Sequence, residues 1–179
     1  AVANQDLAGL ILFSDQVERF LPPRKGRNNA LEILREVLYY EPKGKKTSLQ
    51  AACEYAYKML KKRCIIFILS DWIDSGYERS LKILAAKNEV VALQVVDDSE
   101  LELPPAGILS LKDPETGEEI WINSSDPKLR KAYQEVINNE QKELQEFFRE
   151  CNCDYLMIKT SDSYVSSLRK FFALRGKRR

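Results

Sequence analysis

The chain has 179 residues, of which 44% are hydrophobic and 31% are charged, with 28 Lys and Arg against 27 Asp and Glu. This composition is typical of a globular protein and excludes a disordered or collagen-like chain. A net charge of +1 supplies no overall field that would attract nucleic acid or an acidic membrane. The sequence contains no histidine, which excludes Ser-His-Asp and Cys-His catalysis and every histidine-bearing metal site.

Strands and helices alternate along the chain. The predicted strands are apolar runs bounded by turn residues, at 7–13, 64–70, 89–96 and 154–159. The predicted helices run from Asn28 or Asn29 to before Pro42, from Thr47 or Ser48 to about Arg63, and over about 77–87, 126–150 and 161–172. This order predicts a doubly wound, Rossmann-like α/β fold with a mostly parallel sheet and helices on both faces.

Three segments depart from this alternation. Residues 17–21 read as an edge strand that is stopped by Pro22 and Pro23. Alternating apolar and polar residues at 108–123 predict an inserted β-hairpin, after a loop over 97–107. The whole chain, 1–179, is expected to form one domain truncated at its N-terminus, with a basic and partly disordered tail at 170–179.

Two polar residues are expected to meet at the carboxyl edge of the sheet, where ligands bind in such folds. The helix from Ser48 to Lys62 is roughly 22 Å long at about 1.5 Å per residue. The strand at 64–70 is roughly 23 Å long at about 3.3 Å per residue. A helix and a strand of equal length return the chain to the same edge, so Thr47 and Asp71 should be neighbours. A hydroxyl and a carboxylate suit a hard cation such as Mg²⁺.

The loop residues after the strands also allow alternatives to this site. Loop aspartates after strands could support metal-dependent hydrolysis of a phosphoester or ester, with Asp71, Asp74 and Asp97 as the candidates. The string Gly44-Lys45-Lys46-Thr47 lacks the first glycine of a phosphate-binding loop and follows a helix, which excludes that motif. No signal peptide or C-x-x-C pair is present, so the four cysteines are expected to be reduced and the chain cytoplasmic.

Four segments carry a resemblance to a known family: LAGLILFSDQVERFLPPRKGRNNALEILRE (7–36), TSLQAACEY (47–55), IIFILSDWIDSGYERSL (65–81) and VVALQVVDDSELELP (90–104). They resemble the von Willebrand factor A-like domain of the bacterial domain-of-unknown-function family fifty-eight. The resemblance covers nearly the whole chain. It implies a fold in which Thr47 and Asp71 match two ligands of a Mg²⁺-dependent adhesion-type site, and a partner protein supplies an Asp or Glu carboxylate to the metal.

The resemblance also implies a biological setting. Members of this family are membrane-anchored bacterial proteins associated with MoxR-type AAA+ ATPases, so this chain is expected to lie on the cytoplasmic side and to act in protein assembly or maturation. The expected function is therefore a protein-interaction module and not an enzyme, with no nucleic acid partner and no membrane span in this chain. The metal-dependent hydrolase stays the alternative.

The sequence departs from the family pattern at one place. The family resemblance implies an Asp-x-Ser-x-Ser motif before Thr47, and this sequence contains none. The first, central strand is expected to lie upstream of Ala1. Mg²⁺ is therefore expected at low occupancy. Without that strand, the apolar strands at 7–13 and 64–70 would have unpaired edges, which predicts a direct pairing between them or a strand-exchanged oligomer.

Overall fold

A computed structural model of the chain describes residues 6–112 and 117–177. The contacts within the chain divide it into two compact units. Unit 1 comprises Ala1–Arg63 and Asp74–Lys87, and unit 2 comprises Cys64–Ile73 and Asn88–Arg179. Each unit has strands and helices of its own, and the single domain expected over 1–179 stays a prediction.

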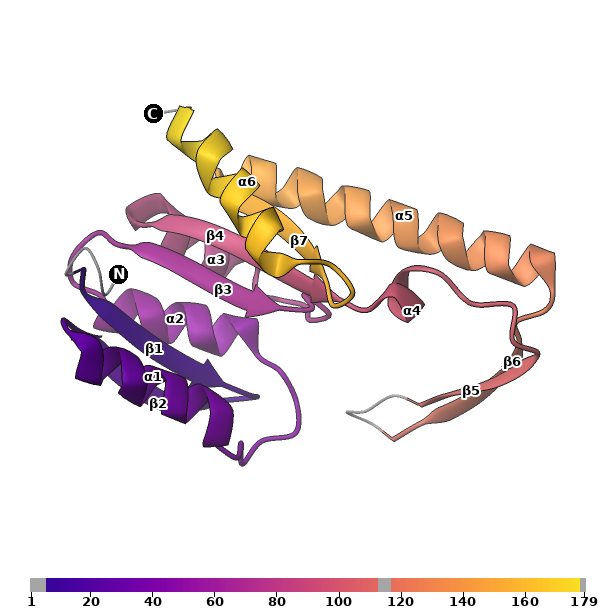
Figure 1. Cartoon of the computed structure of the whole chain (residues 1–179), viewed down its shortest axis with the longest axis horizontal. Helices are drawn as coiled ribbons and strands as arrows, with labels where there is room; N and C mark the ends of the chain where they lie inside the picture. The colour runs from indigo at the N-terminus through magenta and orange to yellow at the C-terminus, as the bar shows by residue number, and fades with distance from the viewer. Residues whose placement is uncertain (1–5, 113–116, 178–179) are drawn as a thin grey trace. The chain divides into compact units, whose positions relative to one another are not determined.

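Unit 1 contains an antiparallel strand pair and three helices (Figure 1). Its elements are β1 (Ala8–Phe13), β2 (Val17–Arg24), α1 (Arg27–Tyr39), α2 (Leu49–Met59) and α3 (Glu78–Lys87). Ser48 caps α2 as expected, because its side chain accepts a hydrogen bond from the Ala51 backbone N–H. Helix α2 ends at Met59, before the expected end near Arg63.

The prediction that Pro22 and Pro23 stop the second strand is wrong, since β2 continues to Arg24, opposite Ala8 of β1. Among the described residues its one strand partner is β1, so the prolines remove no hydrogen bond from a second neighbour there. The expected cap of α1 is also corrected, because α1 is capped by Gly26 at φ 98°. Asn29 is instead buried, and its Nδ2 donates to the carbonyls of Ala8 at 2.9 Å and Arg24 at 3.0 Å.

Unit 2 is built on a parallel sheet with the strand order β3-β4-β7. Its elements are β3 (Ile65–Ser70), β4 (Glu89–Val96), α4 (Asp98–Leu101), β5 (Ile108–Lys112), β6 (Glu119–Asn123), α5 (Pro127–Glu150), β7 (Asp154–Lys159) and α6 (Tyr164–Lys177). The short helix α4 lies in the segment that the sequence predicts as loop. The predicted α/β class with a parallel sheet is confirmed.

Helices α5 and α6 cover opposite faces of this sheet, because neighbouring residues of a strand point to opposite sides. Tyr155 of β7 stacks on Phe148 of α5, with 5.2 Å between ring centroids. The preceding residue, Asp154, contacts Arg175 of α6 through an ion pair of 2.8 Å. The central strand β4 is accordingly covered on both faces, and residues 90–93 are buried.

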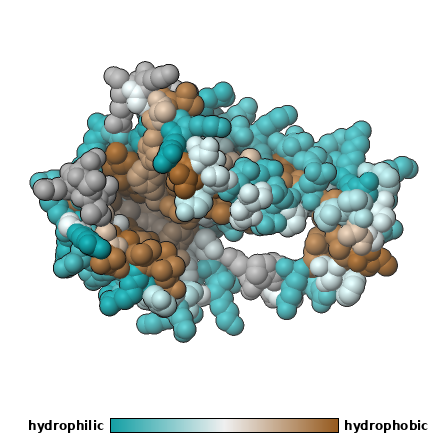
Figure 2. Space-filling model, viewed as in Figure 1, coloured by the Kyte–Doolittle hydropathy of each residue, from teal (hydrophilic) through white to brown (hydrophobic). Residues whose placement is uncertain are grey.

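The predicted hairpin is present as β5 and β6, paired antiparallel with Leu109 opposite Ile122. Its turn, over 113–116, lies outside the described residues. The buried Ser124 fixes its base, since the Ser124 Oγ donates to the Gly107 carbonyl at 2.9 Å and accepts from the Ala106 N–H at 3.0 Å. The hairpin exposes apolar atoms, which Figure 2 shows at the right of the view, and Trp121 is 69% exposed.

The expected end of the last helix near Phe172 is corrected by the structure, because α6 continues to Lys177, and the basic tail expected over 170–179 stays a prediction. Arg175 explains this extension. Its side chain is 14% exposed and pairs with Glu89 at 2.9 Å and with Asp154 at 2.8 Å, which ties the last turns of the helix to the sheet. Residues 178 and 179 lie outside the described part of the chain.

The two strands that the sequence predicts to have unpaired edges each have one strand neighbour in the described residues, β2 for β1 and β4 for β3. All four cysteines are free thiols. Among the helices that the structure describes, none is long and apolar enough to cross a bilayer.

Candidate functional site

Thr47 is half-buried and directly precedes Ser48, the cap of α2, in unit 1. The segment that leads to it, 40–48, is held against the turn after β1. The Ser48 N–H donates to the Ser14 carbonyl at 2.8 Å. The position of Thr47 is therefore set by a hydrogen bond from the residue after it, and by the anchoring of the residues before it.

That anchor is the carboxylate of Glu18, on β2. Its Oε1 accepts hydrogen bonds from the Ser14 hydroxyl at 2.7 Å, the Gly44 N–H at 2.9 Å and the Lys43 N–H at 3.0 Å. The Tyr40 hydroxyl donates to Oε2 at 3.3 Å. Bonds to the ionised form, that from Ser14 first, lower the pKa of Glu18 from 4.5 to about 2.

Glycine is required at position 44 by the same close approach. A Cβ there would lie 2.0 Å from the Asp15 Oδ1 and 2.3 Å from the Ser14 Oγ. Any side chain would push the 40–48 segment away from Ser14 and weaken the bonds from Lys43 and Gly44 to Glu18.

A Glu18→Gln variant is expected to be less stable than the wild type at neutral pH. Because the pKa of Glu18 is lower in the folded state, its contribution is present above pH 4.5 and is lost as the pH falls towards 2. The free energy of unfolding of the variant should therefore fall less steeply than that of the wild type as the pH is lowered over this range. Urea unfolding followed from pH 2 to 7 measures this, with Glu41→Gln, an exposed neighbour, as the control. Parallel curves for Glu18→Gln and wild type would contradict the assignment.

Asp71 is exposed and directly follows β3 in unit 2. The chain turns sharply there, because Trp72 adopts a left-handed backbone with φ 66°, which is unusual for an aromatic residue. The Asp71 Oδ1 accepts from the Ile73 N–H at 3.1 Å and from the Ser70 hydroxyl at 3.3 Å. Strained turns of this kind persist only where surrounding contacts hold them.

The contacts that hold this turn come from α5, β4 and β7. Trp72 is 5% exposed and lies edge-on to Phe148 of α5, at 4.7 Å between ring centroids. Gln94 of β4 is buried, and its Nε2 donates to the Asp71 carbonyl at 3.1 Å. The Tyr155 hydroxyl donates to the Gln94 Oε1 at 2.5 Å. Strands β4 and β7 thus support the turn that presents Asp71.

A second polar cluster joins the carboxyl ends of β4 and β7. Asp97 accepts from the hydroxyls of Ser99 at 2.6 Å and Thr160 at 2.8 Å. These bonds, with one from the Ser99 N–H, lower the pKa of Asp97 to about 2. Asp98 pairs with Lys159 at 2.8 Å, and hydrogen bonds from Lys159 and Ser161 lower its pKa as well. These carboxylates hold strand ends together.

The aspartates of the hydrolase alternative are divided between the units. Asp74 belongs to unit 1, where its Oδ2 accepts from the Leu49 N–H, the first amide of α2, at 2.7 Å. Asp71 and Asp97 belong to unit 2. Over residues 6–112 and 117–177, the structure contains no group of three or more His, Cys, Asp or Glu that could hold a metal ion.

Thr47 likewise lies in unit 1 and Asp71 in unit 2, so their pairing stays a prediction. Sequence reasoning missed the residues that hold them in place, Glu18, Gly44, Gln94 and Tyr155. One signal was available for Gln94, because it is a polar residue within the apolar run VVALQVV (90–96) and must find a partner there.

Comparisons with known proteins bear on this geometry. A family model described as "Protein of unknown function DUF58" matches residues 1–143. The chain belongs to this family. The predicted resemblance to this family is thereby confirmed, and the description of the family names no activity.

Curated relatives are uncharacterised proteins. Those of Mycobacterium bovis and Mycobacterium tuberculosis are each 27% identical over 158 residues, which is 87% of this chain and 50% of theirs. The chain therefore spans about half the length of these relatives. A Mycobacterium avium protein is 27% identical over 84% of this chain and 90% of its own.

Two solved structures share the fold. The conserved hypothetical protein BatB of Bacteroides thetaiotaomicron is 17% identical with a TM-score of 0.55, over 97% of this chain and 80% of that one. An aerotolerance-related membrane protein of Bacteroides fragilis is 16% identical with a TM-score of 0.53, over 93% of this chain and 79% of its own. This likeness supports the α/β fold of the DUF58 chain.

Proposed function

We propose that this chain is a protein-interaction module and not an enzyme, in which Mg²⁺ held by Thr47 and Asp71 binds a carboxylate of a partner protein. The observation that carries the proposal is the turn at Asp71. An exposed carboxylate stands at the carboxyl end of a parallel strand, on a strained backbone that buried Trp72 and Gln94 support. Ligand sites of parallel α/β sheets lie at this edge.

The oxygen donors suit the proposed metal. Mg²⁺ prefers oxygen ligands and keeps several waters, so one hydroxyl and one carboxylate from the protein are chemically adequate. The hydrogen bonds to the Asp71 carboxylate engage only Oδ1, and Oδ2 accepts no hydrogen bond from the described residues. A partner Asp or Glu would displace one metal-bound water.

The proposed partner is a MoxR-type AAA+ ATPase, with the parent protein anchored in a membrane and this domain on the cytoplasmic side. The support is the family resemblance, together with the structural likeness to a Bacteroides fragilis protein described as an aerotolerance-related membrane protein. The role of the pair would be the assembly or maturation of other proteins.

The test is an Asp71→Asn variant in a binding assay. The MoxR-type ATPase of the same genome is immobilised, and binding of the chain is measured by surface plasmon resonance in Mg²⁺ and in EDTA. Loss of a ligand oxygen should weaken Mg²⁺-dependent binding by at least about tenfold. Asp162→Asn, the same change at another exposed aspartate of unit 2, should leave the affinity unchanged.

Two results would contradict the proposal. Equal binding of Asp71→Asn and wild type in Mg²⁺ would show that Asp71 holds no bridging metal. Turnover of p-nitrophenyl phosphate that requires Mg²⁺ and is lost in Asp71→Asn would instead support the hydrolase.

A further inference from the structure

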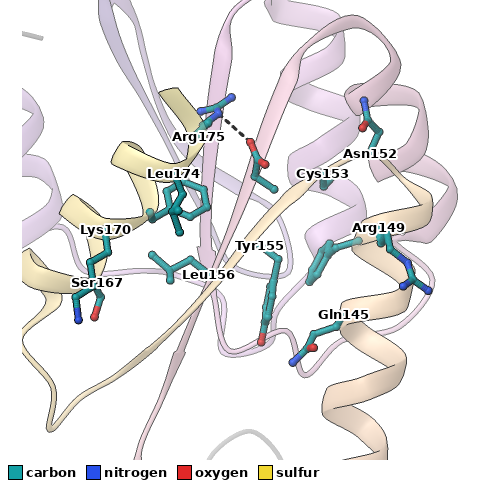
Figure 3. Close-up of a pocket in the computed structure, with 13 residues that line it drawn as sticks. Gln145, Arg149, Asn152, Cys153, Tyr155, Leu156, Ser167, Lys170, Leu174 and Arg175 are labelled. Atoms are coloured by element: carbon teal, nitrogen blue, oxygen red, sulfur yellow. Dashed lines mark ion pairs between the residues drawn. The ribbon is translucent and has the colours of Figure 1, made fainter. Parts of the chain in front are cut away.

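A groove runs along the free edge of β7 in unit 2. Its volume is about 640 Å³, and it is lined by the C-terminal end of α5, the start of β7 and the second half of α6. Figure 3 shows β7 passing between α6 on one side and α5 on the other. A cavity of this size is within the range of protein ligand sites.

The backbone of β7 forms the floor of the groove, and its free edge can still form hydrogen bonds with a further strand. In the sheet order β3-β4-β7, β7 has a strand neighbour on one side only among the described residues. An edge strand presents a row of N–H and C=O groups to any extended chain beside it. The strand is six residues long, which corresponds to about 20 Å of extended peptide.

The two walls offer side-chain contacts on both faces of an added strand. Leu156 points towards α6, whereas Tyr155 extends towards Gln145 of α5 (Figure 3). An added strand would also alternate its side chains between the α5 side and the α6 side. The groove is thus arranged to accept an extended peptide and not a helix, whose diameter of about 10 Å exceeds the spacing of about 4.8 Å between strands.

The charged side chains that line the groove favour an acidic peptide. Three cationic side chains line the groove, against one carboxylate, that of Asp154. Arg175 is already paired with Glu89 and Asp154. Arg149 on the α5 wall and Lys170 on the α6 wall are exposed and have no ion pair within the described part of the chain. These two cations complement carboxylates on either side of an added strand.

We propose that this groove binds an extended, acidic segment of a partner protein, which adds to the edge of β7 as a further strand and pairs its carboxylates with Arg149 and Lys170. Backbone pairing supplies affinity in this mode of recognition, and the flanking side chains supply specificity. The surface differs from the proposed Thr47 and Asp71 site and needs no metal.

The probe is a six-residue peptide of alternating Asp and Val with blocked ends, labelled with fluorescein. Binding to the full 179-residue chain is followed by fluorescence anisotropy. The double variant Arg149→Glu with Lys170→Glu should bind at least about tenfold more weakly. Arg169→Glu, which changes the same charge on α6 outside the groove lining, should bind within about twofold of wild type. EDTA should leave the affinity unchanged, which separates this surface from the metal-dependent one.

Backbone pairing is tested on the wild-type chain with two modified peptides. One edge of an extended peptide carries alternate amides, so N-methylation of the amides that face β7 should abolish binding, and methylation of the others should preserve it. Equal binding of both methylated peptides would overturn the proposal. So would equal binding of a Lys and Val peptide, or a dimer in size-exclusion chromatography whose formation the acidic peptide does not reverse.

Discussion

Replacing Phe148 with alanine is expected to lower the free energy of unfolding of unit 2 by about 3–5 kcal/mol. Phe148 has no exposed surface and contacts Trp72 and Tyr155 through its ring. Removal of the ring would leave a cavity between α5 and the sheet, beneath the turn that presents Asp71. The same variant should therefore weaken the proposed Mg²⁺-dependent binding of a partner.

The matched control is Phe172→Ala on α6, a ring that is 43% exposed and contacts Phe67 on the other face of the sheet. Its loss should destabilise the protein by less than half as much, because less apolar surface leaves contact with protein. Guanidinium unfolding followed by circular dichroism measures both variants. Equal losses would show that Phe148 is not central to the packing of α5.

Replacing Gln94 with leucine is expected to lower the free energy of unfolding by about 1–3 kcal/mol. Gln94 connects the Tyr155 hydroxyl to the Asp71 carbonyl, so the variant removes one hydrogen bond from each group. The Tyr155 hydroxyl keeps Gln141 of α5 as a partner at 3.1 Å, whereas the Asp71 carbonyl loses its Gln94 donor. Leucine matches glutamine in size, and the loss therefore reports the hydrogen bonds and not a cavity.

A double-mutant cycle with Tyr155→Phe separates this network from simple packing. If the hydroxyl and the amide act together, the free energy of unfolding that the double variant loses should be smaller than the sum of the two single losses, by at least about 0.5 kcal/mol. Additive losses would mean that Gln94 and Tyr155 support the turn independently. The cycle is measured by urea unfolding of the full chain.

The alternation of strands and helices could be predicted from the sequence because it depends on local pattern. The run EVVALQVV (89–96) and the helix from Pro127 to Glu150 have the predicted bounds, since each begins and ends at an unambiguous apolar or capping signal. The ends of β2 and α6 were missed for a different reason. The end of α6 depends on a partner distant in the sequence, Glu89 for Arg175. The end of β2 depends on the sheet, because the prolines are tolerated where β1 is the one strand neighbour among the described residues.

Of the candidate site, only Thr47 and Asp71 were predictable from the sequence. Thr47 and Asp71 lie at boundaries between elements, which the sequence marks. The groups that hold them are brought together over long separations, as in the bonds from Gly44 to Glu18 and from Tyr155 to Gln94. No periodicity connects such residues. The left-handed backbone of Trp72 was equally unpredictable, because bulky residues seldom adopt it.

We propose that Thr47 and Asp71 hold one metal ion together. Paramagnetic Mn²⁺, which also takes oxygen ligands, can replace Mg²⁺ in ¹⁵N-labelled protein. We expect the backbone amide signals of Thr47 and Ser48 to broaden at the same Mn²⁺ concentration as those of Asp71 and Ile73, and excess Mg²⁺ to restore both. Broadening at only one of the two segments, or at neither, would contradict the account.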